Sequence, residues 1–546
     1  MKKLIIYLFI GLFLIGSLAS CGSTKVNIED NSKELLSNKI ENEKHLILNN
    51  DGSYGGTLNS SRYGKGAPLN GEYDVKDSIY YSINDYYNML STKKRLIYPN
   101  FKGYQQTMKD SSGLACAVAM LNYFGEDISV YSELELLKRY EDLNNSVVYQ
   151  NGTTPEGLQK LFNNLGYGAQ INNYEIKGSS RQEYVGAFKE WALSNLSNGL
   201  MALVRYQDNM DNRWRLIIGY DTMGTDEWNT DDIVIFMDPY DGFDHYQDGY
   251  SIEAAGRFER WWKSVELSGV VSSQLECVVV TPKEQIKIET VESDPNEIIP
   301  SNIPEIHLIL NKDGSYGGTT DSVKYGEGTP LNGKYDHIDR NYWVFNDYYN
   351  LGNTDTRYLL TNYRAMQQTM ASSCGICSTL SALNYYGEDV IDLYNEIWLV
   401  NKYEELTGKT VKGSGVGGSG LEDVIESIGY AATYDSFARD SYKDEFDLCF
   451  GSYDVFTNFI TMNLSKGTPM PISWRPHGGH WEVIIGYDNM GTDYIYDDVI
   501  ILADSGDSWD HYQDGYNTLP ATLFFRQWYN GSYTYNQQFV YFSNTK

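Results

Sequence analysis

The sequence predicts two consecutive domains of similar size, each combining helices with antiparallel strands. The first observation is a long internal repeat: HLILNNDGSYGG at 45–56 recurs as HLILNKDGSYGG at 307–318. The second is a run of apolar residues at helical spacing after position 374, and the third is a pair of β-branched stretches at 480–488 and 499–504 that are typical of strands. Because solenoid repeats are far shorter than this one, the pattern indicates a duplicated domain.

The length of the chain supports the same organisation. Residues 21–546 are too many for one hydrophobic core and suit two domains of about 250 residues each. The acidic, proline-containing stretch PKEQIKIETVESDPNEIIPSNIPE is typical of a linker. We therefore predict a tether at 21–43, a first domain at 44–281, a linker at 282–305 and a second domain at 306–546.

The N-terminus has the pattern of a bacterial lipoprotein signal peptide. Lys2 and Lys3 precede an apolar run that ends in Leu-Ala-Ser, and Cys21 follows directly. A transmembrane helix is the alternative, but the apolar run is short for a membrane span. We predict that residues 1–20 are removed, that Cys21 carries a lipid anchor in the membrane, and that the mature protein lies outside the cytoplasm in the cell envelope.

Charge and cysteine content limit the partners and the means of stabilisation. The formal net charge of -30 argues against nucleic acid as a partner. Six cysteines are few for an exported chain of this length, so we expect the fold to depend on its cores and not on disulfides. The sequence does not determine how Cys116, Cys277, Cys377 and Cys449 would pair.

The two copies differ where a catalytic nucleophile and its base would stand. QQTMASSCGICSTLSALNYYGED at 367–389 places Cys374 opposite Ser112 of the first copy. GGHWEVIIGYD at 478–488 likewise places His480 opposite Arg213. Since a nucleophilic thiol works with a base, their joint presence in one copy and joint absence from the other predicts one catalytic and one non-catalytic domain.

The predicted helix gives Cys374 a setting suited to catalysis. Cys374 opens this helix, which we expect to stop at Gly387. The partial positive charge and free N–H groups of a helix N-terminus favour the thiolate. Gln368 lies six residues earlier, so its side-chain amide could bind a developing oxyanion together with the backbone N–H of Cys374.

The two predicted strands supply a base and a residue that orients it. If 480–488 and 499–504 pair as an antiparallel hairpin, His480 at the start of one strand lies beside Asp504 at the end of the other. A carboxylate there would hold the imidazole in the tautomer that can accept the thiol proton. His477 is an alternative base, separated from the strand by glycines.

These motifs resemble the C39 and C39-like cysteine peptidases of the papain-like superfamily over most of 362–530. The resemblance rests on Gln368, the Cys374-Gly pair, the Asn-Tyr-Tyr-Gly that ends the helix, Gly-His-Trp around His480, and Asp504. It implies an α+β fold with a helical part on an antiparallel sheet, and a peptide or protein substrate with no metal and no cofactor. It also implies that Cys374 is the nucleophile, His480 the base, Asp504 its orienter and Gln368 the oxyanion residue. The chain departs from the family at Ser505, where a proline is usual.

The first copy keeps part of this pattern as a degenerate site. Gln106 and Asp238 remain, the latter followed by the usual proline, while Ser112 and Arg213 replace the nucleophile and the base. An arginine is always protonated and cannot accept a proton, so we predict a catalytically dead domain. Its cation could instead hold a carboxylate of the substrate.

Other functions use the same residues. The thiol chemistry also serves a cell-wall amidase or a transpeptidase-like acyltransferase, and both domains could be binding modules without turnover. The spacing of Cys374 and Cys377 is that of a redox motif, but no βαβ pattern surrounds it.

Three further segments favour structural interpretations. The aspartates crowded into 238–249 and 504–515 lack the spacing of an EF-hand and favour turns over a metal site. The glycine-rich stretch 412–430 is expected to be a loop and a helix with Ser419 and Glu422 as a capping box, since it lacks the lysine of a phosphate loop. The DGSYGG segments occur in both copies, which favours hairpins over carbohydrate binding.

Overall fold

The computed structural model describes most of the chain from residue 79 to residue 542. It describes residue 47, residues 79–297 with gaps at 82–84, 109, 172–173, 175–180, 209–210, 226–230, 242–247 and 264–274, residues 307–309 and 342–343, and residues 347–542 with gaps at 371, 437–452, 475–478, 494, 508–511, 513 and 530–537. We call the described residues up to 297 the first half and those from 307 onward the second half. The signal peptide, Cys21, Cys449, His477 and the DGSYGG segments lie outside the described residues.

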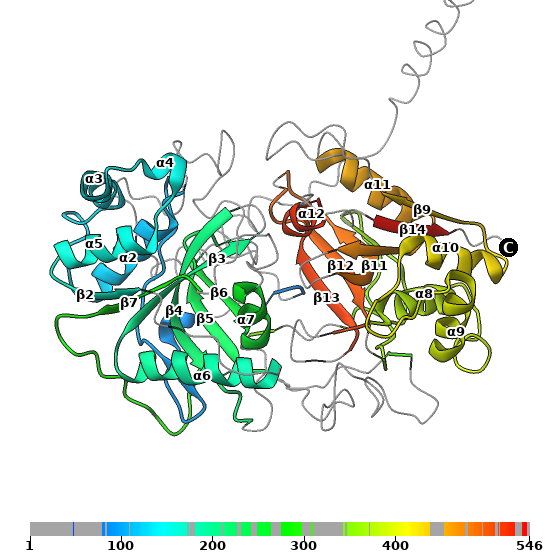
Figure 1. Cartoon of the computed structure of the whole chain (residues 1–546), viewed down its shortest axis with the longest axis horizontal. Coiled ribbons are helices and arrows are strands. Elements are labelled where there is room, and N and C mark those ends of the chain that lie inside the picture. The colour runs from blue at the N-terminus through cyan, green and yellow to red at the C-terminus, as the bar shows by residue number, and fades with distance from the viewer. Residues whose placement is uncertain are drawn as a thin grey trace, which may run out of the picture. The chain divides into compact units, whose positions relative to one another are not determined.

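The first half is built on an antiparallel sheet of seven strands in the order β2-β7-β3-β4-β5-β6, with β1 paired to β4 (Figure 1). Long β-branched and aromatic runs in β4 and β5 fit a sheet that is covered on both faces, because both alternating sets of side chains are buried. The strands are β1 (Arg95–Ile97), β2 (Gly168–Ile171), β3 (Met201–Asp208), β4 (Asp211–Asp221), β5 (Ile233–Met237), β6 (Tyr250–Ala254) and β7 (Cys277–Thr281).

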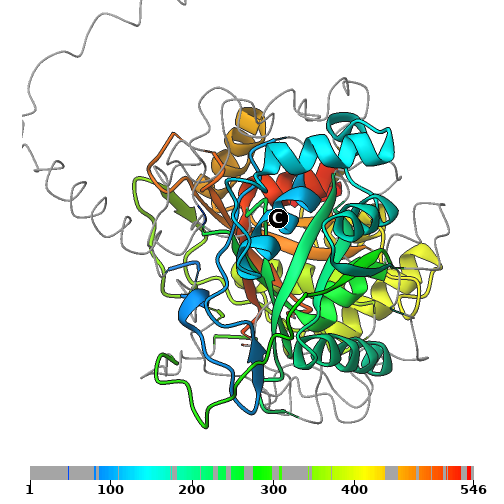
Figure 2. The ribbon, with the colours of Figure 1, turned by 90° about the vertical axis from the view of Figure 1, so that its left-hand side faces the viewer.

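Helices cover this sheet. Figure 2 turns the first half toward the viewer and shows the cyan helices and the blue-green helix α6 at different sides of the green strands. The helix α2 is almost wholly buried and packs against β4, while α6 and α7 pack against each other. The helices are α2 (Ser112–Tyr123), α3 (Glu133–Asn144), α4 (Val148–Asn151), α5 (Pro155–Asn164), α6 (Arg181–Ser197) and α7 (Ala255–Lys263), with a short 3-10 turn, η3 (Tyr86–Asn88).

The second half has a sheet of the same design, in the order β13-β12-β11-β10-β14-β9 with β8 paired to β11. Read from the other edge, this is the strand order of the first half. The strands are β8 (Arg357–Leu359), β9 (Ala432–Ser436), β10 (Met470–Trp474), β11 (His480–Asp488), β12 (Val499–Asp504), β13 (Tyr516–Pro520) and β14 (Gln538–Phe542). The helices are α8 (Cys374–Tyr385), α9 (Glu396–Thr407), α10 (Gly418–Ser427), α11 (Tyr453–Ser465) and α12 (Ala521–Tyr529).

The elements expected around the candidate site form as the sequence indicates. The α8 helix begins at Cys374 and ends just before Gly387, whose φ of 92° is the left-handed conformation that glycine adopts freely. The strands β11 and β12 pair antiparallel, and Glu482 lies opposite Asp504. Helices on an antiparallel sheet make the fold α+β. The α8 helix packs against β10 and β11, which brings its N-terminus to the strand that carries His480.

The capping box expected at Ser419 and Glu422 does not form. The N-cap of α10 is Gly417, which makes no side-chain capping bond, and Ser419 lies inside the first turn. Close packing explains the difference: a Cβ on Gly418 would lie 2.1 Å from the Tyr434 ring, and one on Gly420 would lie 2.3 Å from Tyr403. The helix therefore starts where glycines let the backbone approach these two rings.

The stretch predicted as a linker lies against the first half over residues 282–297. Ile286 and Ile288 pack against the core, and Thr290 forms a parallel bridge with Ser91. We call this segment the strap. Within the described ranges, no helix combines the length and the apolar composition needed to cross a membrane.

Candidate active site

Cys374 is held at the first position of α8 with its sulfur facing β11. Its side chain is only 7% exposed. The backbone N–H groups of Trp481 and Gly375 donate hydrogen bonds to the sulfur. Both groups stabilise a thiolate, because they place positive partial charge beside the sulfur.

Gly375 is needed for this placement. A Cβ at Gly375 would lie 2.3 Å from Val416 and 3.1 Å from the Trp481 indole. The indole is fixed in turn by a 3.1 Å hydrogen bond from its Nε1 to the carbonyl oxygen of Val416. The glycine after the cysteine thus lets the helix N-terminus approach the strand closely.

His480 and Asp504 meet as the hairpin predicts. His480 Nε2 lies 2.6 Å from Asp504 Oδ1. Because a carboxylate only accepts hydrogen bonds, Nε2 carries the proton in this contact, which leaves Nδ1 for the thiol. Asp504 is itself held, since its Oδ1 accepts from the Gly506 N–H at 2.6 Å and its Oδ2 from Asn517 at 3.4 Å.

The electrostatics favour a thiolate and imidazolium pair. Burial acts to raise the pKa of Cys374, but the hydrogen bond and charge of His480, with the two backbone N–H groups, hold that pKa below its ordinary value. Burial acts to lower the pKa of His480, but the charge and hydrogen bond of Asp504, with those of Cys374, raise it well above its ordinary value. Each partner therefore stabilises the charged form of the other.

Gln368 is tied to the loop that leads into α8. Its Nε2 donates to the carbonyl oxygen of Met370 at 2.9 Å, and Ser373 Oγ donates to the same oxygen at 2.8 Å. A side-chain amide has two N–H donors, so this bond uses one and leaves the capacity for another. Gln368 is thereby coupled to the residue that directly precedes Cys374.

The departure from the family pattern at Ser505 preserves the contact that the proline makes in the first half. The carbonyl oxygen of Ser505 accepts from the Gln368 N–H at 2.9 Å, as that of Pro239 accepts from the Gln106 N–H at 2.8 Å. The Ser505 hydroxyl adds a 3.3 Å bond to Gln368 Oε1. The serine therefore adds a second link between the Gln368 loop and the end of β12.

The crowded aspartates build turns. Asp504, Asp507 and Asp514 accept from the backbone N–H groups of Gly506, Gly515 and Tyr516, at 2.6, 2.6 and 3.0 Å. These bonds form turns at the two described ends of the segment between β12 and β13, which is the turn chemistry expected from the sequence.

Glu396 is a supporting residue that the sequence reasoning missed. Its buried carboxylate accepts from Thr369 Oγ1 at 2.5 Å and from Ser373 Oγ at 2.7 Å, so it joins the neighbours of Gln368 and Cys374. In the first half, Glu133 binds Thr107 in the same way at 2.7 Å. The signal available in the sequence was a glutamate at the start of the next helix in both copies.

The first half places its degenerate residues at the same positions. Ser112 Oγ accepts from the Trp214 N–H at 3.1 Å, as Cys374 accepts from that of Trp481. Gln106 Nε2 donates to the carbonyl oxygen of Met108 at 3.0 Å. The Arg213 guanidinium, which replaces the imidazole, is 5% exposed and lies 3.2 Å from the centre of the Tyr240 ring.

The two halves differ in the sign of one buried charge near the base position, which is Arg215 in the first half and Glu482 in the second. The sequence reasoning also missed this difference. Arg215 Nε lies 2.9 Å from Asp238 Oδ2, and its guanidinium also pairs with Glu253. Burial opposes ionisation of Asp238, but the charge of Arg215 holds the pKa of this carboxyl below its ordinary value. The second half has Glu482 at the place of Arg215, 3.6 Å from His480 Nε2. A comparison of residues 213–215 (RWR) with residues 480–482 (HWE) could have revealed this charge reversal from the sequence.

One group of described residues has donor atoms close enough for a metal ion. The donor atoms of His480, Glu482 and Asp504 lie within 4.8 Å of one another. A metal there would displace the bond between His480 and Asp504, so this set fits the thiol chemistry better than a resident metal site.

The other described cysteines are unlike Cys374. Cys116, Cys277, Cys374 and Cys377 are all free and buried. Burial and the neighbouring carboxylate of Glu396 raise the pKa of Cys377 well above its ordinary value, so it stays a thiol. Cys374 and Cys377 form no disulfide.

The comparisons with known proteins agree with this geometry. No curated protein matches the chain. A family does match it, and the matched segment runs from the end of β8 to just before β14, which includes Gln368, Cys374, His480 and Asp504. Residues 360–536 of this chain match the Peptidase_C39 like family.

Proposed function

We propose that the second half is a cysteine peptidase in which Cys374, His480, Asp504 and Gln368 act together. The observation that carries the proposal is the joining of Cys374, His480 and Asp504 by hydrogen bonds at the N-terminus of α8. The family match supports peptide-bond hydrolysis over other uses of the same thiol chemistry.

The proposed reaction has two stages. The thiolate of Cys374 attacks the peptide carbonyl, and the negative oxygen is stabilised by the Cys374 backbone N–H and the Gln368 amide. The imidazolium of His480 then protonates the leaving amine, and a thioester remains on Cys374. In the second stage, neutral His480 takes a proton from water, whose oxygen attacks the thioester and releases the acid. His480 keeps the proton taken from water and Cys374 leaves as a thiolate, so the starting thiolate and imidazolium pair is restored.

Alkylation across a pH series tests this proposal. We expect iodoacetamide to label Cys374 rapidly at pH 6, where an ordinary thiol with a pKa of about 8.5 is almost wholly protonated. The reason is the lowered pKa of Cys374 and the raised pKa of His480, which together extend the charged pair to lower pH than an ordinary thiol would reach. Labelling should fall as the pH drops through the lowered pKa of the thiol. Peptide mass spectrometry identifies the labelled cysteine.

Cys377 is the internal control for this measurement. Its pKa is raised, so it should stay unlabelled in the folded protein at the same pH. If Cys374 reacts only above about pH 8, as a free thiol does, the pair does not exist and the second half is a binding module.

We also propose that the chain is a bacterial lipoprotein of the cell envelope, anchored through Cys21, and that its first half is catalytically dead. The support for the anchor is the Leu-Ala-Ser-Cys pattern, and the support for the dead half is the joint replacement of thiol and imidazole.

Mass spectrometry of the mature N-terminus checks the anchor. We expect a diacylated or triacylated Cys21 as the first residue, and Cys21→Ala should leave the signal peptide uncut or release a protein without lipid. An unmodified mature terminus elsewhere within 16–30 would contradict this proposal.

A further inference from the structure

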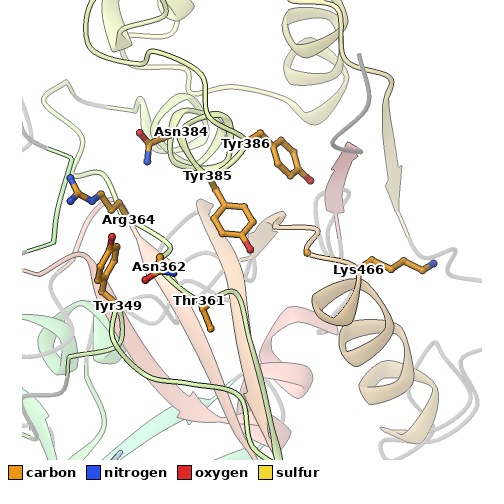
Figure 3. Close-up of a pocket in the computed structure, with 9 residues that line it drawn as sticks. Tyr349, Thr361, Asn362, Arg364, Asn384, Tyr385, Tyr386 and Lys466 are labelled. Atoms are coloured by element: carbon orange, nitrogen blue, oxygen red, sulfur yellow. The ribbon is translucent and has the colours of Figure 1, made fainter.

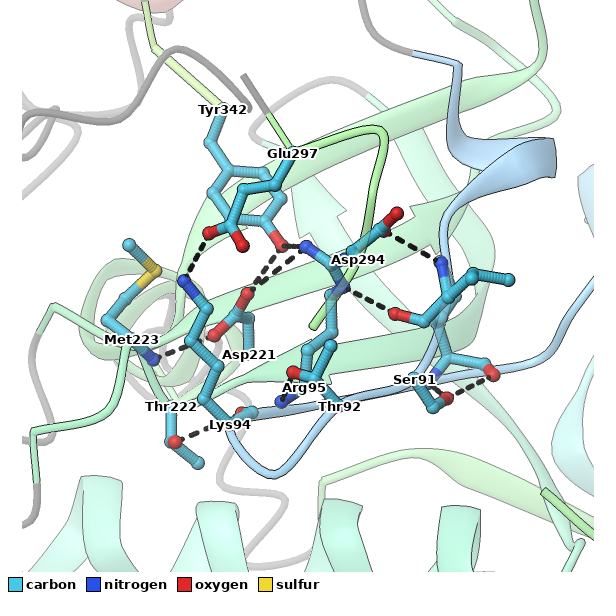
Figure 4. A network of polar contacts seen from close by, with 12 residues as sticks. Ser91, Thr92, Lys94, Arg95, Asp221, Thr222, Met223, Asp294, Glu297 and Tyr342 are labelled. Atoms are coloured by element: carbon cyan, nitrogen blue, oxygen red, sulfur yellow. Dashed lines mark hydrogen bonds and ion pairs between the residues drawn. The ribbon is translucent and has the colours of Figure 1, made fainter. Parts of the chain in front are cut away.

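The strap covers one surface of the first half. Gly199, in the turn between α6 and β3, lies so close to Ile286 that an added Cβ would be 2.4 Å from the Ile286 carbonyl oxygen. Further along, the Val291 N–H donates to the carbonyl oxygen of Ser91 at 2.8 Å. Asp294 then binds Arg95 Nη2 at 2.5 Å, within a network that also includes Asp221 (Figure 4).

The strap is extended, and one set of its side chains faces inward. Ile286 and Ile288 are half-buried and pack against the core, whereas Lys287 and Glu289 are exposed. This alternation is the period of two that an extended chain produces on a surface. The strap also encloses the chain before β1, since Ser91 is only 4% exposed.

Among the described residues, the same surface of the second half is more exposed. Asn353 and Thr354, at the places of Ser91 and Thr92, are exposed. Asn353 makes the same local contacts as Ser91, because its side chain bonds both the N–H and the carbonyl oxygen of Leu359 as Ser91 does those of Ile97. The difference in exposure therefore comes from the covering segment and not from a change in the turn.

The second half has a pocket beside Gly467, the counterpart of the glycine that Ile286 contacts in the first half. Gly467 follows Asn-Leu-Ser-Lys as Gly199 follows Asn-Leu-Ser-Asn, and both have a positive φ, of 72° and 70°. Gly199 is buried, but Gly467 lines a pocket of about 610 Å³ (Figure 3). The pocket includes Tyr385 at the last turn of α8, roughly 16 Å along the helix from Cys374, so it is separate from the proposed catalytic centre.

The pocket has one more positive charge than its first-half counterpart, because Lys466 stands in the place of Asn198. Figure 3 shows Arg364 beside Tyr349 at one side of the pocket and Lys466 at the other. Arg364 and Lys466 are exposed, and they stand where the first half has Lys102 and Asn198. Between them lie aromatic and amide side chains that can contact an apolar residue and hydrogen-bond a backbone.

We propose that this surface, from the Tyr349, Arg364 and Lys466 pocket to Asn353, docks an extended acidic peptide segment of a partner protein. The ligand has the chemistry of the strap: two branched apolar residues in alternation, followed by acidic residues. The apolar pair enters beside Gly467 as Ile286 does beside Gly199. Acidic side chains that flank the pair, as Glu284 and Glu289 flank it in the strap, meet Arg364 and Lys466. Arg357, the counterpart of Arg95, is 8% exposed and contacts Tyr80 and Asp488 as Arg95 contacts Tyr342 and Asp221, so an aspartate equivalent to Asp294 would add to the same kind of network.

A synthetic peptide with the sequence of residues 283–297 is the probe. We expect the fluorescein-labelled peptide to bind the full chain saturably in an anisotropy titration, with unchanged affinity when Cys374→Ala is present. Replacing both isoleucines of the peptide by aspartate should weaken binding at least tenfold, since each substitution removes a buried branched apolar side chain and puts a charge in its place.

Matched variants of the protein locate the bound peptide. Arg364→Glu with Lys466→Glu should weaken binding at least tenfold, whereas Lys102→Glu, at the covered surface, should leave it unchanged. No saturable binding, or equal weakening by Lys102→Glu, would overturn the proposal. So would a concentration-dependent dimer that Arg364→Glu abolishes, because the occupant would then be a second copy of the chain. Prior alkylation of Cys374 should not affect binding, so the two proposals fail independently.

Discussion

Removing the Cys374 thiol should abolish amide hydrolysis. With a fluorogenic peptide selected from a substrate library, we expect Cys374→Ala to lower kcat by on the order of 10⁴-fold or more, because this substitution removes the thiol that is paired with the His480 imidazole. His480→Ala should cost a similar factor, since it removes the proton acceptor and the charge that stabilises the thiolate. Steady-state kinetics on the purified full-length chain gives both values.

The matched control is Cys377→Ala, which changes a buried thiol three residues away on the same helix. It should leave kcat within a few-fold of the unchanged protein. Asp504→Asn should give a slower enzyme that still alkylates at Cys374, because the nucleophile remains and the orientation of the imidazole is lost. Full activity in Cys374→Ala would disprove the mechanism, and loss of activity from His477→Ala but not from His480→Ala would reassign the base.

Restoring the missing pair to the first half should not restore its chemistry. We combine Ser112→Cys with Arg213→His in the background of Cys374→Ala. At pH 6, we expect iodoacetamide to label the new thiol about tenfold or more slowly than it labels Cys374 in the unchanged protein. A tenfold difference corresponds to one pKa unit. The reason is Arg215, which binds Asp238 and adds a buried positive charge that disfavours an imidazolium.

Two further substitutions test that reason. Adding Arg215→Glu and Glu253→Leu gives the first half the residues found at the same places in the second, and we expect alkylation at position 112 to accelerate. The rate at pH 6 is the measurement, and circular dichroism confirms that the variants are folded. Fast alkylation in the double variant alone would show that the charge reversal does not matter.

The residues of the candidate site could be found from the sequence because the signals are local. Cys374 is the first residue of a regular helix. His480 begins the first strand of a single hairpin and Asp504 ends the second, so both lie at its open end, and both strands are rich in β-branched residues. Pairing between neighbouring strands follows from their order along the chain, so the contact of His480 with Asp504 was predictable. The internal copy supplied a comparison for each of the four site residues, in Gln106, Ser112, Arg213 and Asp238.

The contacts of the surrounding residues depend on segments far apart in sequence. Glu396 joins Thr369 to Ser373 across 27 and 23 positions, and Ser505 reaches Gln368 across 137. Hydrophobic period and turn chemistry contain no information on such pairings. The failed capping box at Ser419 has the same cause, because two tyrosines from other elements decide where α10 begins.

The sequence alone determined the repeat, the α+β class and which copy carries a thiol and an imidazole, because residue types and their periods suffice for these. Only the tertiary structure showed that Arg215 forms an ion pair with Asp238 in the first half and that Glu482 lies near His480 in the second. It also decided that residues 282–297, acidic and proline-containing as a linker would be, cover the first half, while in the described part of the second half the matching surface is exposed at Asn353 and has a pocket at Gly467. The physical reason is that charge partners and covered surfaces depend on distances through space, which the order of residues along the chain does not fix.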